Sequence, residues 1–204
     1  MAVTCPVGLD TLQLGREIQS IYARVAAEPN GSFHFHRGPH YAASMLRYSA
    51  TALATLPAAT TASFAGVANP HLIAPLVAGA TVVDIGCGAG MDLILAAKAV
   101  GPSGRAIGVD MTEDMLTQAR AGAAAAGLGH VELRRGDALE LPLESESVDF
   151  VLSNGVLNLT PDKRRAYAEV FRILKPGGRF LYGDIVVGHE LEESVRRDID
   201  LWTG

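Results

Sequence analysis

The feature that most constrains this chain is an apolar run that breaks into three glycines at alternate positions, Gly86, Gly88 and Gly90. The run at residues 82–85 is typical of a buried strand, and a helical pattern begins directly afterwards at Met91. Glycine lets the backbone turn sharply and lets a ligand lie against free N–H groups at a helix start. We therefore expect a strand, a ligand-binding turn and a helix. Such a loop alone is compatible with several classes of nucleotide ligand.

A second strand pattern, at residues 105–110, ends in a carboxylate. Asp110 lies 24 positions after Gly86 (110 − 86), close to the roughly 20 residues expected when an acid at the end of the second strand holds a ribose. A ribose diol offers two neighbouring hydroxyl donors, and a carboxylate can accept from both. The alternative is that Asp110 merely precedes a helix whose first turn carries Glu113 and Asp114, where acids are favourable. The combined spacing favours ribose binding.

Composition excludes several classes of protein. The chain has 204 residues, 49% of them hydrophobic, which indicates one globular domain with an appended segment. A net charge of −5 argues against a nucleic-acid-binding surface, which would be basic. Its two cysteines, Cys5 and Cys87, form no disulfide framework or zinc spacing, so we expect a reducing, cytoplasmic location. We find neither an apolar run of about 18 residues nor a secretory signal, and we expect no membrane span.

From residue 71 onward, strand and helix patterns alternate. The expected strands are 81–85, 105–110, 130–134, 148–153 and 178–186. The expected helices are 91–100, 113–126, 161–174 and 190–201, with Thr160 capping the third of these and Pro161 as its first residue. Such alternation indicates an α/β fold, a Rossmann-like doubly wound parallel sheet of order 3-2-1-4-5. A ligand would then lie across the carboxyl ends of strands one, two and four.

The first 70 residues have a different character. We expect a helix over 10–28, a second helical stretch over 40–56 that breaks near Ser49, and a loop with a turn over 57–70. This part is too short to bury a core of its own. We therefore predict a helical cap or lid at residues 1–70 on a core formed by residues 71–204.

Three histidines, His34, His36 and His40, lie within seven positions. Alternation with phenylalanine would place the first two on one face of an extended segment. A metal site is one interpretation, but no cysteine or carboxylate is nearby, and one loop rarely supplies a complete site. We favour a loop over a substrate pocket and expect no metal.

Polar residues also follow the third and fourth strands. In the stretch Gly136-Asp137-Ala138, Asp137 can accept from an exocyclic amine and the Ala138 N–H can donate to a ring nitrogen, as an adenine requires. Met111 can pack on the adenine face, or it can simply fill the core. Asn154 lies nearest the reacting end. No Lys or Arg stands in or just after the glycine loop, which favours adenosine attached to something less anionic than pyrophosphate.

Together these stretches resemble the class I S-adenosylmethionine-dependent methyltransferases. The motifs that carry the resemblance are Asp84–Gly90, Asp110-Met111-Thr112, Gly136-Asp137, Ser153-Asn154 and Leu174–Arg179. The resemblance implies S-adenosylmethionine as cofactor and S-adenosylhomocysteine as product. Asp84 would then point toward the methionine amino group, or be a strand-end acid satisfied by the loop N–H groups. Cys87 would lie within the cofactor loop.

Within that class, the chain is most similar to the arsenite methyltransferase family, on the stretches 100–102, 108–112 and 153–163. Tyr22 resembles a family position at which a tyrosine approaches the cofactor. The family binds trivalent arsenic through cysteine thiolates, but Val67 and Gly155 stand at two of its cysteine positions here. A soft metalloid needs two or three thiolates. Arsenite methylation is therefore the second interpretation, after methylation of another small molecule.

The resemblance also implies two further strands that the sequence after Asp184 does not supply. We expect a chain truncated before a third family cysteine position, and one explanation is a UGA codon meant for selenocysteine. The fifth strand would then be an exposed edge, which a homodimer could cover. If the next in-frame codon of the gene is not UGA, this explanation is wrong.

In-line methyl transfer needs no dedicated acid–base pair, and the sequence identifies no catalytic residue. Five residues are possible groups on the substrate side: His34, His36, His40, Tyr41 and Asn158. Two other classes stay open. A dinucleotide oxidoreductase would need the spacing Gly-x-Gly-x-x-Gly, and here the third glycine comes one residue early. A catalytically silent cofactor-binding protein would fit the missing thiols and strands.

Overall fold

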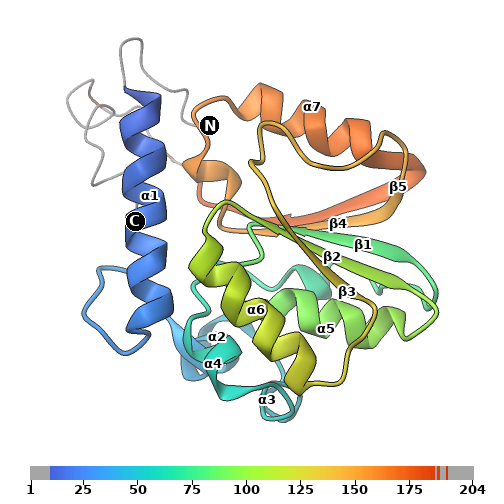
Figure 1. The fold of residues 1–204 in the computed structure, drawn as a ribbon, viewed down its shortest axis with the longest axis horizontal. Helices are drawn as coiled ribbons and strands as arrows, with labels where there is room; N and C mark the ends of the chain where they lie inside the picture. Colours follow the sequence, from blue (N-terminus) through green and yellow to red (C-terminus); the bar gives the residue numbers. More distant parts are fainter. Residues whose placement is uncertain (1–9, 187, 189–191, 193–204) are drawn as a thin grey trace.

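The computed structural model describes residues 10–186, 188 and 192. Five parallel strands form one sheet in the order β3-β2-β1-β4-β5, which confirms the expected topology (Figure 1). The strands are β1 (Thr81–Ile85), β2 (Arg105–Asp110), β3 (Val131–Arg135), β4 (Val148–Asn154) and β5 (Leu174–Gly183). Because the strands are parallel, their carboxyl ends meet at one edge of the sheet.

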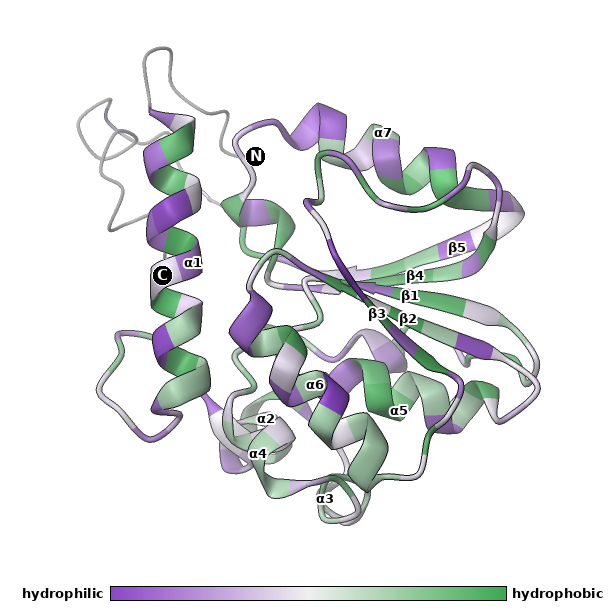
Figure 2. Ribbon diagram, viewed as in Figure 1, coloured by the Kyte–Doolittle hydropathy of each residue, from purple (hydrophilic) through white to green (hydrophobic). Residues whose placement is uncertain are grey.

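Helices cover both faces of the sheet (Figure 1). On one face lie α5 (Met91–Val100) and α6 (Glu113–Ala125), and on the other lies α7 (Lys163–Ile173). Neighbouring residues of a strand point to opposite faces, so Val82 packs with α5 and Val83 packs with α7. Hydrophobic colouring accordingly runs along the central strands and α5 in Figure 2. No helix in the described part of the chain is long and apolar enough to cross a membrane.

Several expected boundaries were wrong. The helix expected at 161–174 begins at Lys163, capped by Asp162, because the Thr160 hydroxyl donates to the Leu157 carbonyl instead of capping. The last strand begins at Leu174 rather than 178, since Leu174 pairs with Val148 ahead of a register shift, and it ends at Gly183. Apart from Glu192, the helix expected at 190–201 lies outside the described residues, and so does Cys5.

The segment before the sheet is helical, as expected. It contains α1 (Thr11–Ala27), α2 (Gly38–Leu46), α3 (Ala50–Leu53), α4 (Ala58–Ala62) and a 3-10 turn, η1 (Pro70–Leu72). The helical stretch does break near Ser49, whose hydroxyl caps α3. The short α4 was missed because its Ala/Thr-rich sequence has no apolar period. Figure 1 shows α1 standing across the end of the sheet, and the Ala26 carbonyl in its last turn accepts from the side-chain amide of Gln118 in α6.

A buried hydrogen-bond network joins this helical segment to the sheet. The carboxylate of Asp92, in the first turn of α5, accepts from the Tyr48 hydroxyl at 2.7 Å, from His71 Nε2 at 3.0 Å and from Asn154 Nδ2 at 3.0 Å. Asn154 Oδ1 in turn accepts from the N–H groups of Val67 and Ala68. Four separate segments thus share one acid and one amide, and burial raises the pKa of the Tyr48 hydroxyl, so that it stays a donor.

We predict that Tyr48→Phe destabilises the protein. The change removes a buried hydroxyl donor to a carboxylate, and hydrogen bonds to charged groups are worth about 1.5–3 kcal/mol. Tyr41→Phe is the matched control, because the Tyr41 ring stacks on His36 while its hydroxyl contacts no acid. Urea unfolding should show a lower midpoint for the first variant only. Equal midpoints for both variants would contradict a structural role for the network.

Candidate functional site

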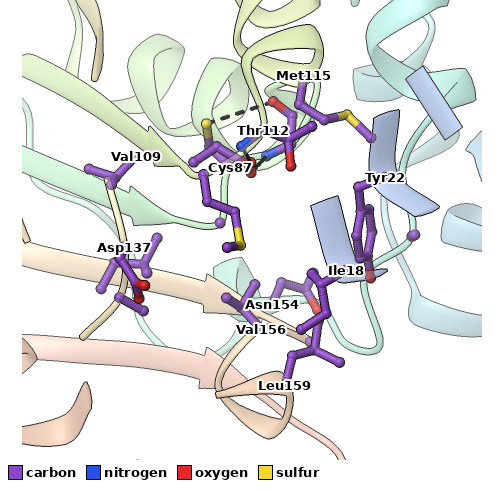
Figure 3. Close-up of a pocket in the computed structure, with 18 of the residues that line it drawn as sticks. Ile18, Tyr22, Cys87, Val109, Thr112, Met115, Asp137, Asn154, Val156 and Leu159 are labelled. Atoms are coloured by element: carbon purple, nitrogen blue, oxygen red, sulfur yellow. Dashed lines mark hydrogen bonds between the residues drawn. The ribbon is translucent and has the colours of Figure 1, made fainter. Parts of the chain in front are cut away.

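A cavity of about 330 Å³ lies at the carboxyl ends of β1, β2 and β4 and is partly roofed by α1. In Figure 3, Ile18 and Tyr22 of α1 face Val109 and Asp137 across it. Its volume lies at the small end of the roughly 300–1,000 Å³ typical of ligand sites. The predicted site residues that line it are Tyr22, Asp84, Gly86, Cys87, Gly88, Asp110, Met111, Gly136, Asp137, Ala138 and Asn154.

The glycine loop between β1 and α5 folds back onto the end of β2. The N–H groups of Gly86 and Cys87 both donate to the Val109 carbonyl, at 2.7 and 3.1 Å. Gly86 has φ +68°, and a Cβ there would lie 2.4 Å from a methyl group of Val156. Gly90, also predicted as a site residue, does not line the cavity: it caps α5 at φ +88° and packs on Ala119. Its part is to turn the backbone.

Asp110 is held in place by the backbone. Its Oδ2 accepts from the Gly88 N–H at 2.9 Å, and its Oδ1 accepts from the Thr112 N–H at 2.8 Å. A carboxylate has about four lone-pair sites, so each oxygen keeps one for a ligand. Burial raises the pKa of Asp110, and the N–H groups of Thr112 and Gly88 counteract that rise. The geometry suits a pair of hydroxyl donors.

Asp84, at the end of β1, is a second acid beside the loop, and unlike the half-buried Asp110 it is fully buried. It is only 3% exposed, and its Oδ2 has no hydrogen-bond partner. Burial raises the pKa of Asp84 well above its usual range, and the charges of Asp92 and Asp110 add to the rise. Buried polar atoms are normally paired, so this one calls for a donor. A cationic donor in the cavity would provide both the missing hydrogen bond and the opposite charge.

The wall opposite the loop comes from α1. Tyr22 stacks on Phe35, with ring centroids 6.1 Å apart, and burial followed by the charge of Asp110 raises its pKa to about 12. Its hydroxyl therefore stays protonated at neutral pH. Met111 packs with Leu14 and Ile18 of α1, so it joins this wall to the end of β2. The thioether and the apolar side chains offer a surface for a flat ring.

The polar residues at the ends of β3 and β4 differ in whether their side-chain atoms are available to a ligand. Asp137 is exposed, and one of its oxygens accepts from the Leu139 N–H at 2.9 Å, which leaves the other oxygen available. Asn154 has protein partners at both its oxygen and its nitrogen, so its amide shapes the wall and has no position left for a ligand. The Cys87 thiol points to the Gly88 carbonyl, and burial raises its pKa well above the usual range.

The groups expected on the substrate side do not line the cavity. His34, His36 and His40 are exposed, and Tyr41 stacks on His36 away from the cavity. Asn158 donates its backbone N–H to Asp184. The expected alternation holds, but it turns the histidines outward and the phenylalanines inward against Tyr22. Among the described residues, no group of three or more His, Cys, Asp or Glu could hold a metal ion.

Sequence reasoning missed other parts of the wall. Asp92 carried a signal, since it is a lone acid in the apolar stretch Met91–Leu95. The remaining wall comes from segments that only the folded chain brings together. Those residues include Thr11, Leu12, Phe64, Gly66, Val156, Leu159 and Pro161.

Comparison with known proteins identifies the family of this site. A methyltransferase-domain family model matches residues 76–203. The chain is 44% identical over 139 residues to an arsenite methyltransferase of Halobacterium salinarum, covering 68% of this chain and 36% of that protein. It is 40% identical over 101 residues to a demethylmenaquinone methyltransferase of Lactococcus lactis, covering 50% of this chain and 40% of that protein. The chain thus spans well under half the length of these two curated relatives.

A solved structure agrees with the sequence relatives. The crystal structure of an arsenic(III) S-adenosylmethionine methyltransferase from Chlamydomonas reinhardtii matches with a TM-score of 0.66 and 38% identity, covering 71% of this chain and 51% of that one. The chain therefore belongs to the class I S-adenosylmethionine-dependent methyltransferases and is similar to the arsenite methyltransferases among them.

Proposed function

We propose that this chain binds S-adenosylmethionine in the cavity and transfers its methyl group in line to a small-molecule acceptor. The observation that carries the proposal is the placement of a buried carboxylate, Asp84, and a half-buried one, Asp110, beside the glycine loop. The Oδ2 atom of Asp84 lacks a hydrogen-bond donor and suits the ammonium group of the methionine part. Asp110 has lone pairs left for the ribose diol.

The other lining residues fit the same ligand. Asp137 and the Ala138 N–H would read the adenine edge, and Met111 would pack on its face, with Gly136 and Tyr22 beside it. The backbone at Gly86, Cys87 and Gly88 would lie along the methionine part, where Gly90 provides the turn. The bound sulfonium supplies an activated methyl group. The chain's own residues orient that ligand, exclude water and hold an acceptor at about 3–3.5 Å from the reacting carbon.

Arsenite methylation stays the second candidate, but the cavity wall does not favour it. Val67 and Gly155 face each other, because a Cβ on Gly155 would lie 3.2 Å from a methyl group of Val67. Two thiolates at these positions could share one soft metalloid, whereas a methyl group and a bare backbone cannot. If S-adenosylmethionine binds and no acceptor is methylated, the chain is a catalytically silent cofactor-binding protein.

The role of the amino-terminal segment also belongs to this proposal. We propose that residues 1–70 act as a cap over a core of residues 71–204, supported by the contribution of Ile18, Tyr22 and Phe64 to the cavity wall. A cytoplasmic location is supported by the lack of a disulfide framework in the sequence.

We predict that Asp110→Asn weakens S-adenosylhomocysteine binding by roughly 30-fold or more, because a charged acceptor for the diol is lost. Isothermal titration calorimetry gives the affinity, and Asp114→Asn, an exposed acid at the start of α6, is the control. The wild type should also prefer this ligand to its 2′,3′-dideoxy analogue, and the variant should lose the preference. An unchanged preference would place the ribose elsewhere.

Asp84 gives the binding reaction a pH dependence. Its pKa is raised in the free protein, so it keeps its proton above the usual carboxyl range of about 4. A cationic ammonium would lower that pKa, so binding should release a proton, and affinity should rise with pH until the free acid is ionised. Calorimetry in buffers of different ionisation enthalpy counts the protons. Equal proton release by Asp84→Asn would contradict this assignment.

A homodimer across β5 is a further proposal. Within the described residues β5 is the last strand of the sheet, and Tyr182 stacks on Phe180 with ring centroids 4.4 Å apart. Apolar side chains near it are exposed, namely Phe171, Ile185 and Val186. Sedimentation equilibrium should detect a dimer that Tyr182→Lys weakens and Arg120→Lys, on α6, does not. A monomer at micromolar concentration would refute it.

A further inference from the structure

One part of the cavity wall carries no charged side chain. It lies between α1, the segment before η1 and the turn after β4, and its side chains include those of Leu12, Phe64, Val156, Leu159 and Pro161. Figure 3 shows Val156 and Leu159 together on this side, across from Cys87 and Thr112. This surface, which we call the acceptor end, has no charged side chain. The hydroxyls of Thr11, Thr60, Ser63 and Thr160 are the polar side-chain groups that the same segments add to the cavity lining.

The ionisable side chains that line the cavity lie instead beside the proposed S-adenosylmethionine site, which we call the donor site. They are Tyr22, Asp84, Cys87, Asp92, Asp110 and Asp137. Among the described lining residues there is no Lys, Arg or His. An acceptor with a carboxylate or phosphate would therefore meet acids and find no cation to pair with. The acceptor must be uncharged apart from its reacting atom, and largely apolar.

The acceptor end also lacks a general base within the described chain, so the nucleophile must be reactive without one. At pH 7.5 roughly 10% of a thiol with pKa about 8.5 is thiolate, against about 0.3% of a phenol with pKa about 10 ionised and about 0.1% of an amine with pKa about 10.4 in its neutral form. Thiols are thus favoured by about 30-fold or more on availability alone.

The protein's own thiol does not change this argument. Cys87 is buried, points to the Gly88 carbonyl, and has a pKa raised by burial, so it stays protonated. A metalloid would need thiolates from the protein, and Val67 and Gly155, at the two family cysteine positions, offer none. We infer that the acceptor is a small, apolar, uncharged thiol that reacts as its thiolate, an inference that rests on the proposed methyl transfer.

The step balances without any further reagent. The acceptor loses its proton to water before it reacts, and the thiolate electron pair forms the new sulfur–carbon bond. The bond from that methyl carbon to the sulfonium sulfur breaks at the same time, and its electron pair stays on that sulfur. The products are a methyl thioether and S-adenosylhomocysteine.

The test compares kcat/KM for benzenethiol, phenol, 4-mercaptobenzoate and arsenite, with rates without protein subtracted. We expect benzenethiol to exceed phenol by at least about 30-fold, because an aromatic thiol is more acidic than the thiol considered above and its ionised fraction exceeds that of phenol by even more. It should exceed 4-mercaptobenzoate by about 10-fold, because the two thiols differ mainly in an added carboxylate that has no partner here. Faster methylation of phenol, arsenite or the carboxylated thiol would overturn the inference.

An added positive charge tests where the acceptor binds. Leu12 lines the cavity but is 75% exposed, so Leu12→Arg adds a cation at the acceptor end without disturbing the core. This variant should raise kcat/KM for 4-mercaptobenzoate relative to that for benzenethiol by up to about 5-fold, which corresponds to the free energy of an exposed ion pair. Gln13→Arg, one residue along α1 and outside the cavity lining, should leave the ratio unchanged. Equal ratios in both variants would move the acceptor elsewhere.

Separate calorimetry with S-adenosylhomocysteine distinguishes the two levels of the argument. If that ligand binds and no thiol is methylated, the inference about the acceptor is wrong and the donor site stands. If the ligand does not bind, both the inference and the proposed function are wrong.

Discussion

The site depends on the hydrogen bonds by which the glycine loop folds back onto the end of β2. Three N–H groups in a row, from Gly86 to Gly88, are taken by the Val109 carbonyl and the Asp110 carboxylate. Those bonds are possible only where β1 and β2 are adjacent and parallel, and only with backbone angles that glycine adopts readily. They set the loop and the acid in a fixed relation, so one local turn defines both halves of the donor site.

The cavity that results is strongly one-sided in charge. Its carboxylates lie at the ends of β1, β2 and β3, while α1 and the turn after β4 contribute apolar side chains. Buried acids without cations raise one another's pKa, as for Asp84 beside Asp92 and Asp110. A cationic ligand relieves that repulsion, so the free protein holds electrostatic strain that the donor would release. The same separation leaves the acceptor to supply its own reactivity.

The sheet, and most of the predicted residues that line the cavity, could be identified from sequence because they depend on short-range patterns. The strands β1 and β2 and the helix α5 were correct to the residue, since glycine, an apolar run and a terminal acid mark them. The N-cap residue of α7 was predicted wrongly, because Thr160 and Asp162 are both good capping residues. Only the hydrogen bond from the Thr160 hydroxyl to the Leu157 carbonyl decides between them. Spacing also did not reveal that His34 turns outward or that the Asn154 amide already has protein partners, because it does not show which way a side chain turns or what it binds.

Asn154 illustrates what such a position does instead. Its amide is bonded to the segment at Val67 and Ala68 and to Asp92, and Asp92 is bonded to Tyr48 and His71. Separating the helical segment from the sheet would break all these hydrogen bonds at once. The free-energy cost would be large, because each buried polar group left without a partner costs about 1–3 kcal/mol. Residues 48–71 and the sheet should consequently melt in a single cooperative transition, with no intermediate in which the wall has opened while the strands persist.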